Sequence, residues 1–336
     1  MTQAAYSTPA ADEAVEPYEV YALRYATHEG RRSAENYLGH DPHGNRGMPL
    51  DFYVWVIRNS QRTVLVDTGF KRELAGRRRR TYFGEPAELL RKLDIDAATI
   101  EDVVITHMHY DHAGNLDAYP RARFHVQESE LAFCTGRCMA HGALRGPFEP
   151  ADVAQAVFRL FEGRIAFVDG DAQLHPGITL HQLGGHTPGL QVVRVATARG
   201  YVVLASDAAH YWDNLRERRP FPIVIDVGRM LDAHAAIERL ADGPNHIVPG
   251  HDPLVRTTFR TLPGEPDVVV LHEPPLEVHG QATGEAIGAA AAEAAGVTEA
   301  TDTSEAADTA DTADTADTAD TADTADTADT AALATH

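Results

Sequence analysis

Four potential metal ligands lie within six consecutive residues of this chain. The segment reads His107-Met-His109-Tyr-Asp111-His112, and it directly follows residues 103–105, an apolar run that predicts a buried β-strand. Neutral imidazoles and carboxylates are the ligands that zinc-like divalent ions prefer. Two histidines two positions apart point to the same side where an extended segment ends. The segment therefore predicts a metal site at a strand end, and it requires a fold that leaves such ends open.

Three further candidate ligands follow other apolar runs. Each stands just beyond the carboxyl end of a predicted strand: His186 after residues 178–183, Asp207 after residues 201–205 and His251 after residues 246–248. Open α/β sheets gather their ligand sites at this edge. We therefore expect all these side chains to converge at one place without disturbing the core.

The remaining patterns predict a mixed α/β domain. Strands are expected at residues 53–57, 63–66, 123–127, 165–168 and 191–196, in addition to those named above. A short helix that contains three leucines is expected to begin at Pro86. Two more helices are expected over residues 151–162 and 228–241, where apolar residues recur at helical spacing. Strands and helices in this order indicate an α/β layered fold.

The ends of the chain differ in composition from its middle. Residues 281–336 contain 13 acidic residues, no Lys or Arg, and eight perfect Asp-Thr-Ala triplets. A period of three matches neither helix nor strand, and such a repeat has nothing large to bury. We predict a flexible N-terminus over residues 1–17, one domain over residues 18–280 and a disordered acidic tail over residues 281–336.

Charge and composition argue against several partners. The formal net charge is −21, of which −8 belongs to residues 1–280, and no basic or aromatic groove is evident, so a nucleic-acid partner is not expected. There is no apolar run long enough to span a membrane and no export signal, so we expect a cytoplasmic protein without a membrane partner. The low number of cysteines, two, agrees with a cytoplasmic location.

The chain resembles the metallo-β-lactamase-fold hydrolases, and within them the N-acyl-homoserine lactonase branch. The resemblance covers about residues 50–255 through the motifs Val66-Asp67-Thr-Gly69, Thr106-His107-Met-His109-Tyr-Asp111-His112-Ala-Gly114, Gly185-His186-Thr-Pro-Gly189, Ser206-Asp207-Ala208 and Pro249-Gly250-His251. It implies an αβ/βα four-layer sandwich. It assigns His107, His109 and His186 to one metal ion, Asp111, His112 and His251 to a second, and Asp207 to both. Asp67 would support the ligand loops.

This resemblance implies a dinuclear hydrolase that opens a lactone ring, the activity called quorum quenching when the lactone is a signal. Two divalent ions would hold a bridging hydroxide that attacks the carbonyl, and Asp111 would pass a proton to the departing alkoxide. Zinc is the expected metal, although iron, cobalt and manganese suit the same ligands. Acyl-chain length and oligomeric state are not readable from the pattern.

One position departs from the lactonase pattern. The family places a tyrosine three residues after the bridging aspartate, where it orients the substrate carbonyl. Here that position is His210, and the tyrosine comes one residue later as Tyr211. Both are therefore candidate catalytic residues.

Other functions and sites stay open at this point. A thioester hydrolase of the glyoxalase II kind uses the same metals, but it normally ends in a basic segment rather than an acidic repeat. A non-catalytic interaction protein acting through the acidic tail is the remaining class. The run Arg77-Arg-Arg-Arg80 is more simply a solvated charge run than a grip for a substrate carboxylate or phosphate. Residues 133–148 fit an acyl-chain wall and ordinary loop packing equally well.

Overall fold

The computed structural model describes residues 15–276. The predicted acidic tail, residues 281–336, lies outside this range, as do residues 1–14 of the predicted flexible N-terminus. Both predictions remain predictions. Within the described range, no helix has the length and the apolar character needed to cross a membrane.

The larger of two sheets combines an antiparallel half with a parallel half. Its main order is β13-β14-β1-β2-β3-β5-β6-β7, and β4 pairs with β1 beside this path. Strands β3, β5, β6 and β7 run parallel to one another. Its strands are β1 (Glu19–His28), β2 (Leu50–Arg58), β3 (Thr63–Val66), β4 (Thr81–Tyr82), β5 (Asp102–Val104), β6 (Arg123–Gln127), β7 (Ile165–Val168), β13 (Thr261–Leu262) and β14 (Glu265–Val270).

The smaller sheet has the order β12-β11-β10-β9-β8. Its strands are β8 (Ala172–His175), β9 (Ile178–Gln182), β10 (Gln191–Thr197), β11 (Gly200–Ser206) and β12 (Ile247–Pro249). All neighbours are antiparallel except β11 and β12, which run parallel. The carboxyl ends of β11 and β12 therefore lie at the same edge.

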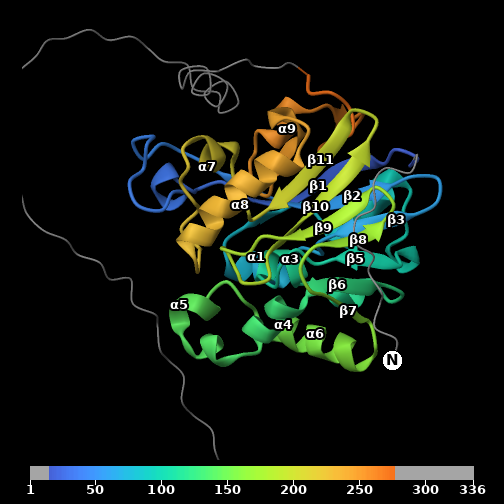
Figure 1. The fold of residues 1–336 in the computed structure, drawn as a ribbon, viewed down its shortest axis with the longest axis horizontal. Helices are drawn as coiled ribbons and strands as arrows, with labels where there is room; N and C mark the ends of the chain where they lie inside the picture. Colours follow the sequence, from blue (N-terminus) through green and yellow to red (C-terminus); the bar gives the residue numbers. More distant parts are fainter. Residues whose placement is uncertain (1–14, 277–336) are drawn as a thin grey trace, which may run out of the picture. The chain divides into compact units, whose positions relative to one another are not determined.

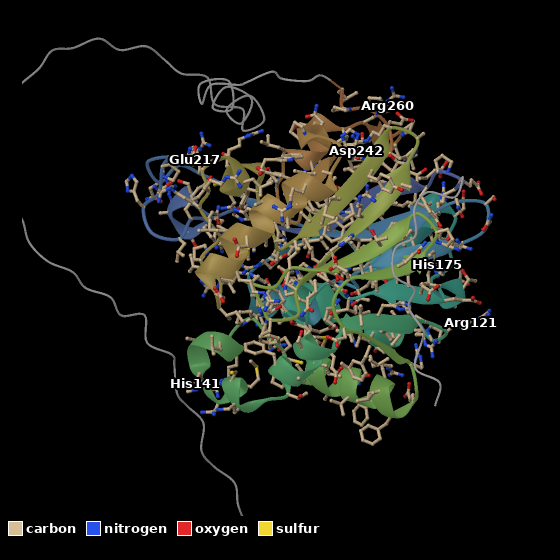
Figure 2. The ribbon with its side chains drawn as sticks, viewed as in Figure 1. Arg121, His141, His175, Glu217, Asp242 and Arg260 are labelled. Atoms are coloured by element: carbon tan, nitrogen blue, oxygen red, sulfur yellow. The ribbon has the colours of Figure 1, made fainter. Side chains whose placement is uncertain are left out.

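The two sheets pack face to face, with helices on both outer sides (Figure 1). Alternation along β11 shows this directly, because Val202 and Leu204 join the core shared with Trp55 of the large sheet, whereas Val203 joins the core under the long helix α8. Side chains fill the space between the layers (Figure 2). The result is the four-layer αβ/βα sandwich expected from the sequence.

Helices cover each sheet with their apolar faces. On the large sheet lie α1 (Arg72–Arg77), α2 (Pro86–Leu89), α4 (Glu128–Cys134) and α6 (Pro150–Phe161), and on the small sheet lie α7 (Trp212–Arg216) and α8 (Val227–Leu240). Short helices α3 (Tyr110–Ala113), α5 (Gly142–Arg145) and α9 (Val255–Thr258) lie in the connections. The helices predicted over residues 151–162 and 228–241 correspond to α6 and α8, each displaced by one residue. The helix predicted from Pro86 is shorter than its leucines indicated, because Leu90–Leu93 continues as a 3-10 turn.

Candidate metal centre

The predicted ligands come together at one edge of the two sheets. His107 and His109 follow β5 of the large sheet, whereas Asp207 and His251 follow β11 and β12 of the small sheet. His186 lies in the connection between β9 and β10. The site is therefore built from both sheets, which explains why its members are scattered along the sequence.

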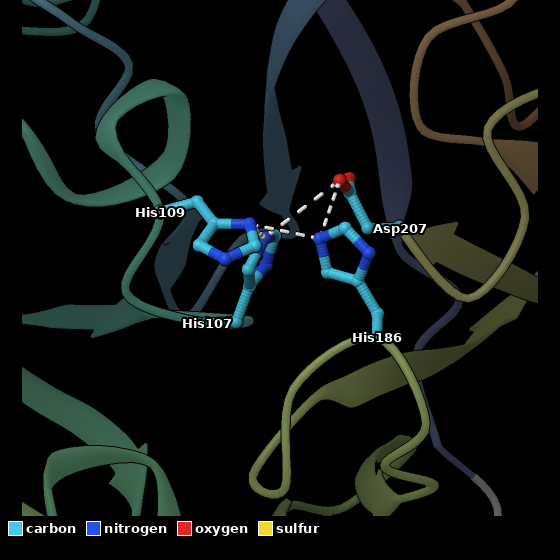
Figure 3. A group of neighbouring side chains, drawn as sticks. All are labelled: His107, His109, His186 and Asp207. Carbon is cyan, nitrogen blue, oxygen red and sulfur yellow. Dashed lines mark hydrogen bonds and ion pairs between the residues drawn. The ribbon is translucent and has the colours of Figure 1, made fainter. Parts of the chain in front are cut away.

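A first group consists of His107, His109, His186 and Asp207 (Figure 3). One ligand atom of each lies within 4.8 Å of the others. Nδ1 of His109 is 3.0 Å from Nε2 of His107 and 2.8 Å from Nε2 of His186, and Oδ2 of Asp207 is 3.1 Å from the same atom of His186. Three ring nitrogens and one carboxylate oxygen thus face a common point.

A second group consists of Asp111, His112 and His251, whose ligand atoms also lie within 4.8 Å of one another. The other oxygen of Asp207, Oδ1, is 3.1 Å from Nε2 of His112 and 2.9 Å from Nε2 of His251. Asp207 therefore turns one oxygen to each group, the arrangement of a bridging ligand.

Hydrogen bonds behind the rings hold three of these histidines in orientation. Nδ1 of His186 lies 2.6 Å from the carbonyl oxygen of Ile223, and Nδ1 of His251 lies 2.8 Å from that of Asp51. Nδ1 of His112 lies 2.7 Å from Oδ2 of Asp67. Such partners fix the tautomer so that Nε2 is left to bind a metal ion.

Asp67 and Ser206 support the ligand loops from an unusual backbone conformation. Both have positive φ, 62° for Asp67 and 45° for Ser206. Each bonds the hydroxyl of buried Thr106, at 2.8 Å from Oδ2 of Asp67 and 2.9 Å from Oγ of Ser206. Asp67 also accepts from the backbone N–H of Thr106 at 2.7 Å. The residue before His107 is therefore held by both sheets.

Glu130 is a supporting residue that sequence reasoning missed. This fully buried carboxylate of α4 accepts the N–H of Met108 at 2.9 Å and that of Gly189 at 3.0 Å. It thereby joins the loop of His107 and His109 to the loop of His186. In the sequence it is one acidic residue among several on a helix, so no pattern distinguishes it.

Burial and the nearby carboxylates shift the pKa values of these histidines in different directions. Burial lowers the pKa of His107 and of His109 well below its ordinary range, so both rings are neutral at pH 7. Burial also opposes protonation of His112, but the carboxylates of Asp207 and Asp111 outweigh it and raise its pKa. Nε2 of His112 is buried and lies 3.1 Å from Oδ1 of Asp207. Imidazole and carboxylate donors around such an atom fit divalent metal ions.

His210 and Tyr211 face different surroundings. Nε2 of His210 is 3.0 Å from Oδ2 of Asp207, and its ring stacks on Phe221 with centroids 3.7 Å apart. The hydroxyl of Tyr211 instead donates to the carbonyl oxygen of Pro49 at 3.0 Å, within the large hydrophobic core. His210 also lies within 4.8 Å of ligand atoms of Asp207 and His251, so it has the position of a further ligand as well.

A pocket of about 310 Å³ opens over the metal centre. Its inner wall contains ligand residues and His210, and Tyr211 is not part of its lining. Its outer wall contains His28, Arg31, Leu50, Phe52, Arg78, Arg80, Phe221 and Ile223. The backbone around Gly146 and Pro147 forms another side, so residues 133–148 contribute to the pocket near their end.

The arginine run is not simply a solvated charge run. Arg77 and Arg79 are exposed, as that interpretation requires, but it is wrong for Arg78 and Arg80, which are half-buried in the pocket wall. The short strand β4 begins directly after Arg80, and no sequence pattern predicted it.

A four-layer sandwich that gathers histidines and carboxylates at the strand ends of both sheets defines the metallo-β-lactamase class of fold. The family model described as the Metallo-beta-lactamase superfamily matches residues 49–251, and the chain belongs to this superfamily.

Relatives of this chain include two curated lactonases. The N-acyl homoserine lactonase AiiB of Rhizobium rhizogenes is 29% identical over 184 residues, which are 49% of this chain and 66% of the relative. An N-acyl homoserine lactonase of a Bacillus species is 23% identical over 195 residues, 52% of this chain and 71% of the relative. The match thus spans about two thirds of these relatives and half of this chain.

Solved structures share the fold. A quorum-quenching N-acyl homoserine lactone lactonase superposes with a TM-score of 0.62 at 18% identity, over 74% of this chain and 98% of that one. AidC, described as a dizinc quorum-quenching lactonase, superposes with a TM-score of 0.55 at 17% identity, over 71% of this chain and 90% of its own.

Proposed function

We propose that this protein is a metal-dependent hydrolase that opens lactone rings, with N-acyl homoserine lactones as its substrate class. The observation that carries the proposal is the bridging position of Asp207, with Oδ1 beside His112 and His251 and Oδ2 beside His186. Curated relatives with that activity support the choice of substrate class.

Two divalent ions are part of this proposal. His107, His109 and His186 would hold one, Asp111, His112 and His251 the other, and Asp207 both. Zinc is the metal we propose, in line with the dizinc description of AidC. When bound, such a pair polarises a carbonyl and lowers the pKa of a water molecule, which supplies a nucleophile at neutral pH.

Three residues of the chain would complete the reaction. Asp111 reaches the pocket with Oδ2 at 3.7 Å from Nε2 of His112, so its carboxylate can take a proton and return it to the alkoxide oxygen of the opened ring. His210 lines the pocket and can donate a hydrogen bond to the substrate carbonyl. Phe221, stacked on His210, would fix the orientation of that ring.

Metal analysis and a substrate panel test the proposal. Protein purified without chelator should contain close to two equivalents of metal and should release acid from N-acyl homoserine lactones at neutral pH. The panel should also include a glutathione thioester and a β-lactam. Activity on the thioester alone would indicate the glyoxalase II kind of reaction instead.

Asp207→Ala is the decisive variant, because it removes an oxygen from both groups. We expect it to lose most of the metal and at least about 100-fold in kcat/KM. Asp171→Asn is the matched control, since this exposed carboxylate pairs with a histidine, His181, away from the site. Full metal content in Asp207→Ala, or less than one equivalent in the wild type, would refute the dinuclear site.

A further inference from the structure

Two arginines in the pocket wall have no acidic partner. Among the described residues, no carboxylate lies within 4.0 Å of the guanidinium of Arg31 or of Arg80, although both line the pocket over the metal centre. Arg78 beside them is different, because Glu149 pairs with it at 2.8 Å. Half-buried cations without a counter-ion are unfavourable in a protein unless something else supplies the negative charge.

The strand pairing brings these side chains together. Thr27 of β1 pairs with Thr81 of β4 in antiparallel register, so the residues that follow β1 lie beside those that precede β4. His28 ends β1, Arg31 follows it, and Arg80 directly precedes β4. Burial, together with the charges of Arg80 and Arg31, lowers the pKa of His28 to about 4. The outer pocket is therefore positively charged at neutral pH.

Both guanidinium groups are held in place and keep N–H groups unused. Arg31 donates from Nε to Oδ1 of Asn36 and from Nη2 to the carbonyl of Glu35 at 2.7 Å, and it lies over the ring of Phe221. Arg80 donates from Nη1 to the carbonyl of Arg78 at 2.6 Å. Its Nε is buried and bonds to no described residue. A planar guanidinium fixed in this way is suited to a carboxylate or a phosphate.

We propose that Arg31 and Arg80 form a subsite for an oxyanion group of the substrate, so that this protein prefers lactones that carry a carboxylate or a phosphate outside the ring ester. The proposal rests on the proposed function, because it places the ester at the metal centre of the same pocket. It implies that a neutral N-acyl homoserine lactone is not the best substrate.

Matched lactones test this preference in the metal-loaded, full-length protein. One substrate is γ-butyrolactone with a carboxylate on the ring, the second is its neutral methyl amide, and the third carries a phosphorylated hydroxymethyl group. The wild type should favour an anionic lactone over the amide by about tenfold or more in kcat/KM. The carboxylate and phosphate arms show which oxyanion fits.

Three variants locate the source of the preference. Arg31→Gln and Arg80→Gln should each reduce the ratio of kcat/KM for the anionic and neutral lactones by about tenfold, and Arg80→Lys should reduce it less because the charge stays. Arg79→Gln is the control, since Arg79 is the exposed neighbour in the same run and should leave the ratio within about threefold. An unchanged ratio in both glutamine variants overturns the subsite.

The outcomes separate this proposal from the lactonase proposal. Equal kcat/KM for charged and neutral lactones would support the lactonase and overturn the subsite. If the wild type opens no lactone, calorimetric titration with inorganic phosphate and with glutarate decides. Binding about tenfold weaker in Arg31→Gln and Arg80→Gln than in Arg79→Gln supports the subsite in another reaction, and equal or undetectable binding refutes it.

Discussion

His210 and Tyr211 are neighbours in the chain, yet their side chains belong to different parts of the molecule. His210 lies in the pocket wall against Asp207, whereas Tyr211 donates its hydroxyl to the backbone at Pro49. The family pattern places a tyrosine where this chain has His210. Position in the pocket therefore favours His210 as the residue that orients the carbonyl.

Phenylalanine substitutions separate the two roles. His210→Phe keeps an aromatic ring for stacking on Phe221 but removes the hydrogen bond, so kcat should fall by about tenfold or more with unchanged metal content. Tyr211→Phe should leave kcat within about twofold and cost roughly 1 kcal/mol of stability. Steady-state kinetics, metal analysis and urea unfolding measure these effects. Loss of metal in His210→Phe would instead make His210 a ligand.

The clustering of the candidate ligands was predictable from sequence, and the outer pocket was not. His107, Asp207 and His251 each follow an apolar run, so the ends of the predicted strands were enough to group them. Arg31 and Arg80 line the same pocket because β1 pairs with β4. Neither strand was predicted, and no local pattern in the sequence encodes a contact between segments 50 residues apart.

At the scale of elements, a carboxylate outside the pocket lining ties the two sheets together. Asp102 of β5 accepts from Nε2 of His125 on β6 at 2.7 Å and from Nε2 of His175 on β8 at 3.0 Å. His175 lies at an edge of the sandwich (Figure 2). Burial alone would raise the pKa of the Asp102 carboxyl, but these two hydrogen bonds hold it well below the usual range.

Asp102→Asn should destabilise the protein by about 2 kcal/mol at pH 7, because the carboxylate accepts two hydrogen bonds. A carboxyl group whose pKa is lowered by folding contributes its full stability at pH values above its ordinary pKa. The difference from wild type should thus persist at pH 5 and shrink below about pH 4. Urea unfolding at each pH measures it.

Asp171→Asn is the comparison, because the exposed carboxylate of Asp171 also pairs with a histidine. This substitution should cost less than about 1 kcal/mol of stability. A difference between wild type and Asp102→Asn that grows on acidification would contradict the role of the ionised Asp102.

Strands were predicted best where the residues before and after an apolar run clearly marked its two ends. The bounds of β3, β6 and β7 agree with the prediction to the residue. The ten-residue strand β1 was missed, although it lies between β14 and β2 in the large sheet. It is buried on both faces and reads as an apolar run broken by Arg24, without the alternation that identifies a half-buried strand.

On the scale of the whole molecule, the described chain remains in contact with the domain up to its last residue. The backbone N–H of Leu271 donates to Val20, and that of Leu276 donates to Thr258 at 2.9 Å. The first bond continues the pairing of β14 with β1, and the second ties the end of the described chain to α9. A boundary near residue 280, which we propose from composition, leaves both bonds inside the domain.

Truncation after residue 280 keeps all of these contacts. We expect kcat/KM within about twofold of the full chain and a nearly unchanged melting temperature, because the removed segment has few large apolar side chains to bury. Differential scanning calorimetry and lactone kinetics on both forms provide the measurement. A clear drop in either would mean that the acidic repeat binds to the domain.

The left-handed backbone conformation of Asp67 and Ser206 affects the choice of stabilising substitutions. Glycine at either position would relieve conformational strain on the order of 1 kcal/mol, but loss of a buried hydrogen-bond partner costs about 1–3 kcal/mol and outweighs it. The same change would remove a partner of Thr106 at the seam between the sheets. Selection for heat resistance and selection for turnover should therefore both retain the strained Asp67 and Ser206.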